Sequence, residues 1–404
     1  MNNSFFLEQS TSLILIIAIS LLFAFLGINH TKKFKGLNNY LTANRNIGVF
    51  SLTTSLTASA LGAWILFGPA SAATWGGIGA VIGYSLGTAF PLFFLIYLGK
   101  KIRNEFPKGS SLIEFMRRKF GKSLFKLILL MTIFYMFIFL CAEVTAISVL
   151  INYISGTEFW ITALVVLSST LIYTLYGGLK ASIFTDNIQM IVIGVLLFIS
   201  FIYITSFTGS KFSFDFVLKK NPQLLSSHYI PNYTAGLTFF IAVAATNLFH
   251  QGNWQRVYAA KNYQTLKKSL IISFLIIIPI VFFMGFSGMV AFSIDPSTRQ
   301  DLGFFSLLLT EQTFFLSLFM FGIFADELPA NFSKYQAHYA FKCDQGEKCA
   351  AAFDKYLNTP EVKAMNLEVD LYALEHQGWN EATHQVSYYY CLLYTSDAAD
   401  ESVR

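Results

Sequence analysis

The chain has 404 residues, of which 54% are hydrophobic, 17% are aromatic and only 13% are charged, and its formal net charge is +5. A soluble globular protein carries about 25% charged residues, so this composition excludes that class and indicates a membrane protein. The positive balance does not indicate nucleic-acid binding, because the Lys and Arg residues lie in segments beside long apolar runs.

The elements predicted in chain order are transmembrane helices. A bilayer core of about 30 Å takes roughly 20 apolar residues as helix. The predicted spans lie at about 12–29, 48–72, 75–99, 124–153, 159–176, 187–207, 234–250 and 269–293, and a further run at 312–325 is too short to cross. The first run follows no basic residue and precedes Lys32-Lys33, which favours a retained anchor helix over a cleaved signal peptide.

The loop charges predict the orientation of these spans. One set of loops holds 17 Lys and Arg residues, and the segments on the other side hold 4. The basic set is 30–47, 99–123, 177–186 and 251–268. The positive-inside rule therefore predicts a multi-pass plasma-membrane protein with its N-terminus outside.

The composition changes after Ala325. Up to that residue the chain has 22 Lys and Arg against 10 Asp and Glu, whereas residues 326–404 have 6 against 13. Within 326–390, three segments alternate like strands and one is helix-like, which predicts a small soluble acidic α+β segment. Such a segment could be a separate binding or enzymatic domain, but it shows no catalytic constellation. No enzyme is therefore predicted here. No metal site is predicted either, because Cys343 and Cys349 have no paired His/Cys set nearby.

The span 48–72 contains Gly62, Gly68 and Pro69 within eight residues. Pro69 has no N–H for the carbonyl four residues earlier, and glycine loosens the helix around it. In lipid the freed carbonyls need partners, and a bound cation is one possibility. The alternative is a kinked, closely packed helix with small residues at its contact face.

Two further spans carry polar residues where lipid disfavours them. Glu143 lies in the middle of a span, where a charge costs about 3 kcal/mol on insertion scales. It is either a substrate, proton or cation contact, or a protonated or internally paired carboxyl that holds two helices together. The HQGNWQR segment after the span 234–250 suits either a broken helix that lines a site, or an interfacial cap with Trp254 as headgroup anchor and Arg256 as a positive-inside residue.

The segment YTLYGGLKASIFTDNIQ joins two spans through an aromatic-Gly-Gly turn and then presents Thr185, Asp186 and Gln189. An acid three residues before a glutamine is more than a turn requires, which suggests ion coupling. Chemistry alone favours a helix-capping role for Thr185 and Asp186. Thr or Asp at a helix start accepts hydrogen bonds from free backbone N–H groups, and the Asp charge suits the helix dipole.

These features together resemble the sodium/solute symporter family, which includes bacterial proline, pantothenate and sugar symporters. Four blocks match in order and spacing, namely NNYLTANRNIG, SLTASALGAW, YTLYGGLKASIFTDNIQ and HQGNWQRVYAAKN. The resemblance covers roughly residues 10–325. It implies an all-α fold of the leucine-transporter kind, with a five-plus-five inverted repeat after one extra helix. It also implies alternating access around a midplane site, and a bacterial inner-membrane location.

The resemblance assigns roles by matching position. The sodium site would take backbone carbonyls of Ala58 and Leu61, and Arg45 and Asp186 match a charged pair tied to cation coupling on the cytoplasmic side. The implied substrate contacts are Gly62, Trp64, Glu143, His250 and Gln251. No organic cofactor is implied. The partners would be a small solute and the lipid bilayer, and the oligomeric state is not predicted.

The chain also departs from the family pattern. Ala60 stands where proline symporters carry Asp, and His250 stands where Asn or Gln is usual. After residue 325 the Ser/Thr segment of the sodium site is missing, so the second repeat is expected to be incomplete. The end CLLYTSDAADE resembles a translated sequencing adaptor. We therefore interpret 326–390 as foreign, 391–404 as adaptor-derived, and the whole as a chimeric sequence.

The predicted function is sodium-coupled symport of a small organic solute, such as an amino acid or similar metabolite, with a proton as the other possible coupling ion. A chain broken inside its second repeat is expected not to transport by itself. The alternative is a symporter-like sensor domain of a signalling protein.

Overall fold

The computed structural model describes residues 6–32, 36–107, 109 and 111–308, and all structural statements below concern these residues. They form helices joined by short turns, with an isolated parallel bridge between Ile47 and Ala260. Side-chain caps begin several of these helices, since Ser111, Ser213 and Asn262 each accept a hydrogen bond from the backbone N–H three residues later. The expected all-helical membrane fold is confirmed, with five described helices long and apolar enough to cross a bilayer.

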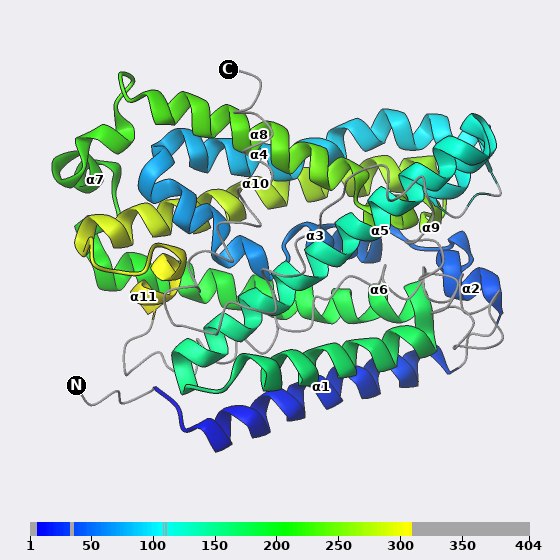
Figure 1. The fold of residues 1–404 in the computed structure, drawn as a ribbon, viewed down its shortest axis with the longest axis horizontal. Coiled ribbons are helices and arrows are strands. Elements are labelled where there is room, and N and C mark those ends of the chain that lie inside the picture. Colours follow the sequence, from blue (N-terminus) through cyan, green and yellow to red (C-terminus); the bar gives the residue numbers. More distant parts are fainter. Residues whose placement is uncertain (1–5, 33–35, 108, 110, 309–404) are drawn as a thin grey trace, which may run out of the picture. The chain divides into compact units, whose positions relative to one another are not determined.

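Helices α1 (Gln9–Thr31) and α6 (Phe159–Thr208) lie side by side. Helix α6 contains both predicted spans 159–176 and 187–207, and its two arms meet at Gly178 (Figure 1). Gly178 has φ 57°, and a Cβ there would lie 2.6 Å from the Tyr40 backbone oxygen. Only glycine combines that conformation with that approach, so the predicted Gly-Gly turn is present.

The predicted span 48–72 is not one kinked helix. Helix α3 (Val49–Ala60) ends, a 3₁₀ turn η2 (Ala63–Leu66) follows, and helix α4 (Gly68–Glu105) begins. Pro69 lies in the first turn of α4, where a missing N–H costs nothing, so it does not free carbonyls inside a helix. The break lies earlier, at Leu61, whose ψ of 46° leaves the helical region.

A second break separates α8 (Ile230–Phe249) from α9 (Gln251–Ala259), with His250 in extended conformation between them. Of the remaining helices, α5 (Leu112–Ser155) and α10 (Tyr263–Ile294) contain predicted spans. Three short helices lie in segments where no span is predicted, namely α2 (Leu37–Thr42), α7 (Phe214–Lys220) and α11 (Gly303–Leu308).

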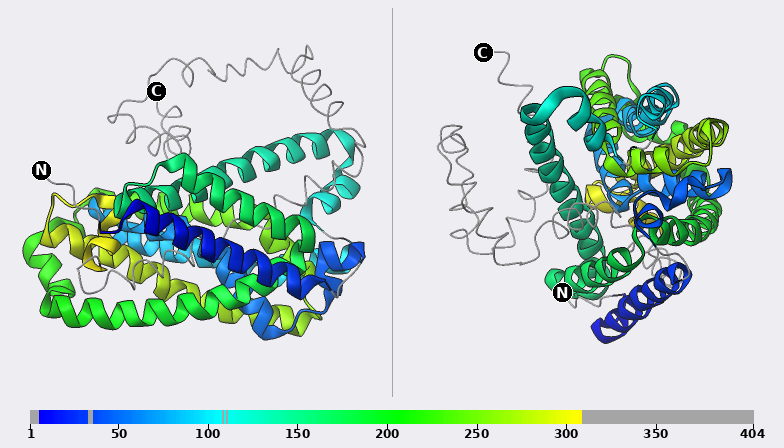
Figure 2. Two further views of the ribbon diagram at one scale, coloured as in Figure 1. Left: turned by 90° about the horizontal axis from the view of Figure 1, so that it is seen from below. Right: turned by 90° about the vertical axis from the view of Figure 1, so that its right-hand side faces the viewer.

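Helix α4 packs against α8 on one side and α10 on the other (Figures 1 and 2). Small residues permit the close approach to α8. A Cβ on Gly83 would overlap the Gly236 backbone oxygen, and one on Gly87 would lie 3.0 Å from the backbone oxygens of Phe239 and Phe240. Such small-residue contacts join helices where the hydrophobic effect between them is absent.

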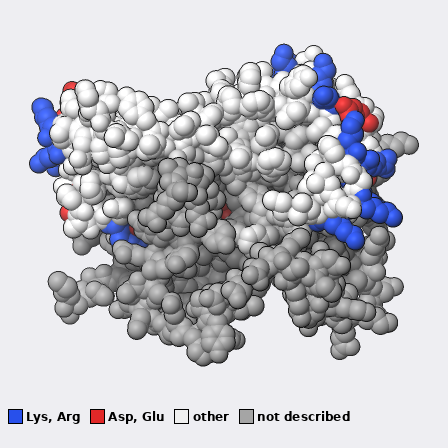
Figure 3. Space-filling view, turned by 45° about the horizontal axis from the view of Figure 1, so that its top comes forward, with Lys and Arg blue, Asp and Glu red and all other residues white. Residues whose placement is uncertain are grey.

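The connections gather at two ends of this helical unit, as the loop charges predict. At one end Arg103 donates to the Ala260 oxygen at 2.6 Å and Lys261 donates to the Ile47 oxygen at 3.0 Å. At the other end Asn221 donates to Ser293 at 3.0 Å. Figure 3 shows Lys and Arg side chains at both ends, with the larger group at the right-hand end, where Figure 1 places α2 and α9. The predictions for 312–325 and for the tail lie outside the described residues.

We predict that Gly83→Ala destabilises the protein, because its new methyl group would overlap the α8 backbone. Overpacking of this kind costs about 1–3 kcal/mol, whereas Gly to Ala in an unobstructed helix is favourable by roughly 0.5–1 kcal/mol. Gly194→Ala in α6 is the matched control, since a Cβ there meets nothing within 4 Å. Thermal unfolding of the purified protein measures both, and a Gly83 variant as stable as the control would contradict the packing.

Candidate functional site

The site begins at the break between α3 and η2. The Leu61 N–H still donates to the Thr57 and Ala58 oxygens, at 3.0 and 3.1 Å, and then the chain turns out of the helix. The next N–H groups begin the 3₁₀ turn and have no acceptor in a preceding helix turn. The Ala63 N–H instead donates to Glu143 Oε2 of α5 at 2.6 Å.

Glu143 is therefore brought directly to the break, and its implied role as a substrate contact stays a prediction. The side chain is 1% exposed, and its other oxygen, Oε1, has no partner among the described residues. A Cβ on Gly62 would overlap this carboxyl group, so only glycine leaves it room. Glu143 joins two elements, as the alternative interpretation expected, and also keeps a free oxygen for a further partner.

The second break is satisfied from within α9. Asn253 donates to the Asn247 oxygen at 2.9 Å, and the Trp254 indole donates to the Leu248 oxygen at 2.8 Å. These side chains cap carbonyl groups at the end of α8. Trp254 is 2% exposed, so its interpretation as a headgroup anchor is wrong.

His250 and Gln251 stand at this second break, each 2% exposed. Both ring nitrogens of His250 and the side-chain oxygen of Gln251 are buried without a partner in the described residues. The His250 ring lies 5.1 Å from the ring of Phe139, one turn before Glu143 on α5. The two breaks thus both meet the same face of one α5 segment, because Phe139 and Glu143 are one helical turn apart. Trp64 lies farther along the break, with its ring 5.9 Å from that of Tyr84.

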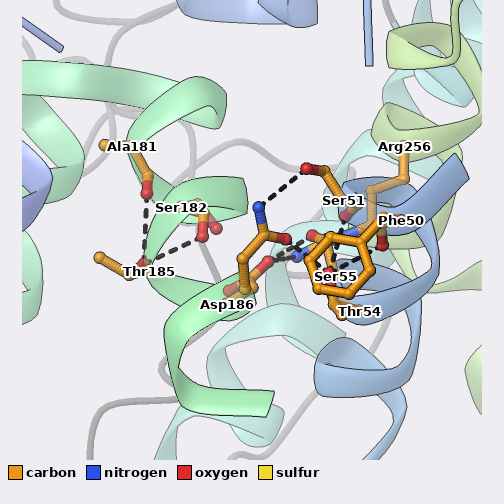
Figure 4. Close-up of polar contacts among 10 residues, drawn as sticks. Phe50, Ser51, Thr54, Ser55, Ala181, Ser182, Thr185, Asp186 and Arg256 are labelled. Carbon is orange, nitrogen blue, oxygen red and sulfur yellow. Dashed lines mark hydrogen bonds and ion pairs between the residues drawn. The ribbon is translucent and has the colours of Figure 1, made fainter. Parts of the chain in front are cut away.

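A buried ion pair lies beside the breaks, between α6 and α9 (Figure 4). Arg256 Nη2 donates to Asp186 Oδ2 at 2.7 Å, and Arg256 Nε donates to Ser55 Oγ at 2.6 Å. The Ser55 hydroxyl in turn donates to the same Asp186 oxygen. Arg256 is 3% exposed, so it is not a residue at the membrane surface, and that interpretation is wrong.

Neighbouring residues strengthen the link between α3 and α6. Thr54 donates to Asn187 Oδ1 at 2.5 Å, and Asn187 Nδ2 donates to Ser51 at 2.9 Å. Thr185 donates to oxygens one turn earlier on its own helix. Because Thr185 and Asp186 lie about two turns inside the second arm of α6, the interpretation of this pair as a helix cap is wrong.

Arg45 lies apart from Asp186 in its contacts. Its Nη2 donates to the Gly109 oxygen at 2.8 Å, and its guanidinium carbon lies 5.9 Å from the centre of the Tyr258 ring. Arg45 and the two residues before it have φ between 47° and 55°, a left-handed conformation that non-glycine residues rarely adopt. Such strained backbone clusters at functional sites. The coupling role of Arg45 stays a prediction.

The sodium site that the resemblance implies stays a prediction, and its two expected residues lie near the end of α3 and directly after it. Ala58 and Leu61 are 2% and 0% exposed, and the nearby Thr57 hydroxyl is buried without a partner there. Carbonyl and hydroxyl oxygens suit a hard cation. No cluster of His, Cys, Asp and Glu able to hold a metal occurs in the described part of the chain.

Sequence reasoning missed Arg256 as the partner of Asp186, and Ser55 as the residue between them. A usable signal was present in the short polar segment QGNWQRVYA, which is buried along its whole length. A nine-residue helix with three amides and an arginine needs internal partners when no face reaches water.

Two discontinuous helices around a polar centre, inside a helical membrane fold, are typical of secondary transporters. The chain belongs to the Sodium:solute symporter family, whose sequence model matches residues 40–303. The prediction of the family from the sequence is thereby confirmed.

Relatives of known function are distant. The Candida albicans spermidine transporter DUR31 is 27% identical over 259 residues, covering 64% of this chain and 49% of the relative. The Vibrio parahaemolyticus sodium/glucose cotransporter is 25% identical over 299 residues, covering 67% and 52%. The chain therefore spans about half the length of these relatives.

The fold is similar to that of a Na⁺-coupled sialic acid symporter solved in a substrate-bound outward-open state. The TM-score is 0.63 at 17% identity, with 80% of this chain and 70% of that chain covered. This similarity confirms the predicted symporter-like helical fold.

We predict that Asp186→Asn destabilises the protein by about 3–5 kcal/mol, because it leaves the buried Arg256 without its anion. Asp301→Asn is the matched control. It breaks a pair whose arginine, Arg299, is 56% exposed, and surface pairs contribute about 0–1 kcal/mol. The free energy of unfolding, measured for both purified variants, gives the comparison. Equal losses would show that the Asp186 pair carries no special stability.

Proposed function

We propose that this chain is the core of a sodium-coupled symporter for a small organic solute in the plasma membrane. The observation that carries the proposal is that two helix breaks meet the Phe139–Glu143 segment of α5, with unpartnered polar atoms at both breaks. In transporters with broken helices, substrate and coupling ions bind where the backbone leaves the helix. The relatives, named for spermidine and glucose, do not agree on one solute.

Sodium is the proposed coupling ion, with Ala58 and Leu61 supplying carbonyl oxygens. Asp186 is the proposed coupling residue, because its ion pair with Arg256 links α3, α6 and α9 beside the break. A change in α3 on sodium binding would reach this pair through Ser55, three residues before Ala58. Separation of α9 from α6 would then accompany opening toward the cytoplasm.

The proposed orientation places the N-terminus outside. Its support is the concentration of Lys and Arg at the end of the unit that carries α2 and α9. A bacterial inner-membrane location and a domain boundary at residue 325 are proposed on the sequence arguments alone.

Sodium should stabilise the purified chain relative to potassium at equal ionic strength. A ligand that binds only the folded state stabilises it by RT ln(1 + [L]/Kd), or about 1.4 kcal/mol at tenfold excess over Kd. Asp186→Asn should reduce this sodium-specific gain, and Asp301→Asn should retain it. Thermal unfolding in the two salts measures the effect.

The coupled activity itself is tested with the whole transporter in proteoliposomes. An inward sodium gradient should drive solute uptake, and an ionophore that removes the gradient should abolish it. Uptake by the whole transporter that ignores the gradient would overturn the proposal.

A further inference from the structure

The free oxygen of Glu143 has no role in the contacts described so far. Glu143 Oε2 receives the Ala63 N–H, and the Trp64 N–H also interacts with this carboxyl group. Glu143 Oε1 is buried and unpartnered in the described structure. Leaving a buried carboxylate oxygen unsatisfied costs more than an ordinary lost hydrogen bond, so a partner is expected there.

The position of the carboxyl group decides which solutes fit. After a break, the first N–H groups of the next helical segment form an anion site, which in some broken-helix transporters holds the substrate carboxylate. Here the N–H groups after the first break bind Glu143 instead. Gly62 leaves room for the carboxyl group, since a Cβ would overlap it. The Glu143 carboxylate therefore occupies the anion site after the first break, and its negative charge would repel a carboxylate of the solute.

Among the described residues no cation takes the free oxygen. None of the ion pairs there includes Glu143, and Arg256 bonds Asp186 and Ser55 while its Nη1 stays without a partner among these residues. The Tyr135 hydroxyl, two turns before Glu143 on α5, donates to the Thr246 oxygen. Within the described residues no cation balances this carboxyl group, so a cationic partner would have to come from elsewhere.

Aromatic side chains are present on both elements that meet at the Glu143 carboxyl group. Trp64 adjoins the residue that binds Glu143, and Phe139 lies one turn before it, against His250. Aromatic faces attract organic cations, and this attraction adds about 0.5–2 kcal/mol per contact. At the second break, Gln251 offers a further unpartnered acceptor.

We propose that the solute is an organic cation whose protonated amine binds Glu143 Oε1, and that solutes bearing a carboxylate are excluded. This inference rests on the proposed function and names its substrate class. It replaces the expectation of an amino acid with that of an amine.

A matched set of four-carbon compounds tests the inference on the unmodified chain in lipid nanodiscs. The set is butane-1,4-diamine, 4-aminobutanoate, butane-1,4-diol and succinate, and radioligand binding is measured in sodium and in potassium. The diamine should bind at least about tenfold more tightly than the diol, which is about 1.4 kcal/mol. 4-Aminobutanoate and succinate should bind more weakly than the diamine, because each brings a carboxylate toward Glu143.

Glu143→Gln tests the carboxylate itself. The amide oxygen can still accept the Ala63 N–H, so the fold is retained, and an unfolding measurement checks this. Diamine affinity should fall at least about tenfold while diol binding stays unchanged. Glu158→Gln, the same change at an exposed glutamate before α6, is the control and should bind like the unmodified chain.

The outcomes separate this inference from the proposed function. Sodium-dependent binding of the diol or succinate with no preference for the diamine would overturn the amine class and leave the symporter proposal standing. Diamine binding that is equal in sodium and potassium would support the amine class and contradict sodium coupling. No diamine binding, or unchanged binding in Glu143→Gln, would sink the inference.

Discussion

In hydrocarbon every backbone polar group needs an internal partner, and this constraint governs both helix breaks of the protein. The N–H groups after Leu61 are satisfied by Glu143, and carbonyl groups at the end of α8 are satisfied by Asn253 and Trp254. The first break therefore requires the Glu143 side chain from α5, and the second requires Asn253 and Trp254 from α9. The polar residues inside the spans follow from this requirement, and so does the glycine at position 62.

The Asp186–Arg256 pair adds a second constraint, because buried charges must stay together or reach water. It ties α6 to α9, and Ser55 extends the link to α3 just before the first break. Any motion that separates α9 from α6 must hydrate both charges or supply new partners. In the proposed transporter this pair would have to break and form again whenever α9 and α6 separate.

The spans could be predicted well because their signal is local. Length and apolar composition place a helix at 234–250 whatever surrounds it, and the Gly177-Gly178 pair marks the turn inside α6. Pro69 misled the interpretation, since it looks like a break but lies in the first turn of α4. The effect of a proline depends on whether a helix turn precedes it, and the break at Leu61 removes that turn.

The sequence by itself determined the membrane class, the order of the spans, the sorting of their loops by charge and the family, because each depends on composition or short motifs. The tertiary structure decided the partners. It placed Arg256, and not Arg45, against Asp186, and it brought the Glu143 carboxylate to the Ala63 N–H across 80 residues of chain. These pairings depend on helix packing between distant segments. Residue types alone do not encode which buried donor meets which acceptor.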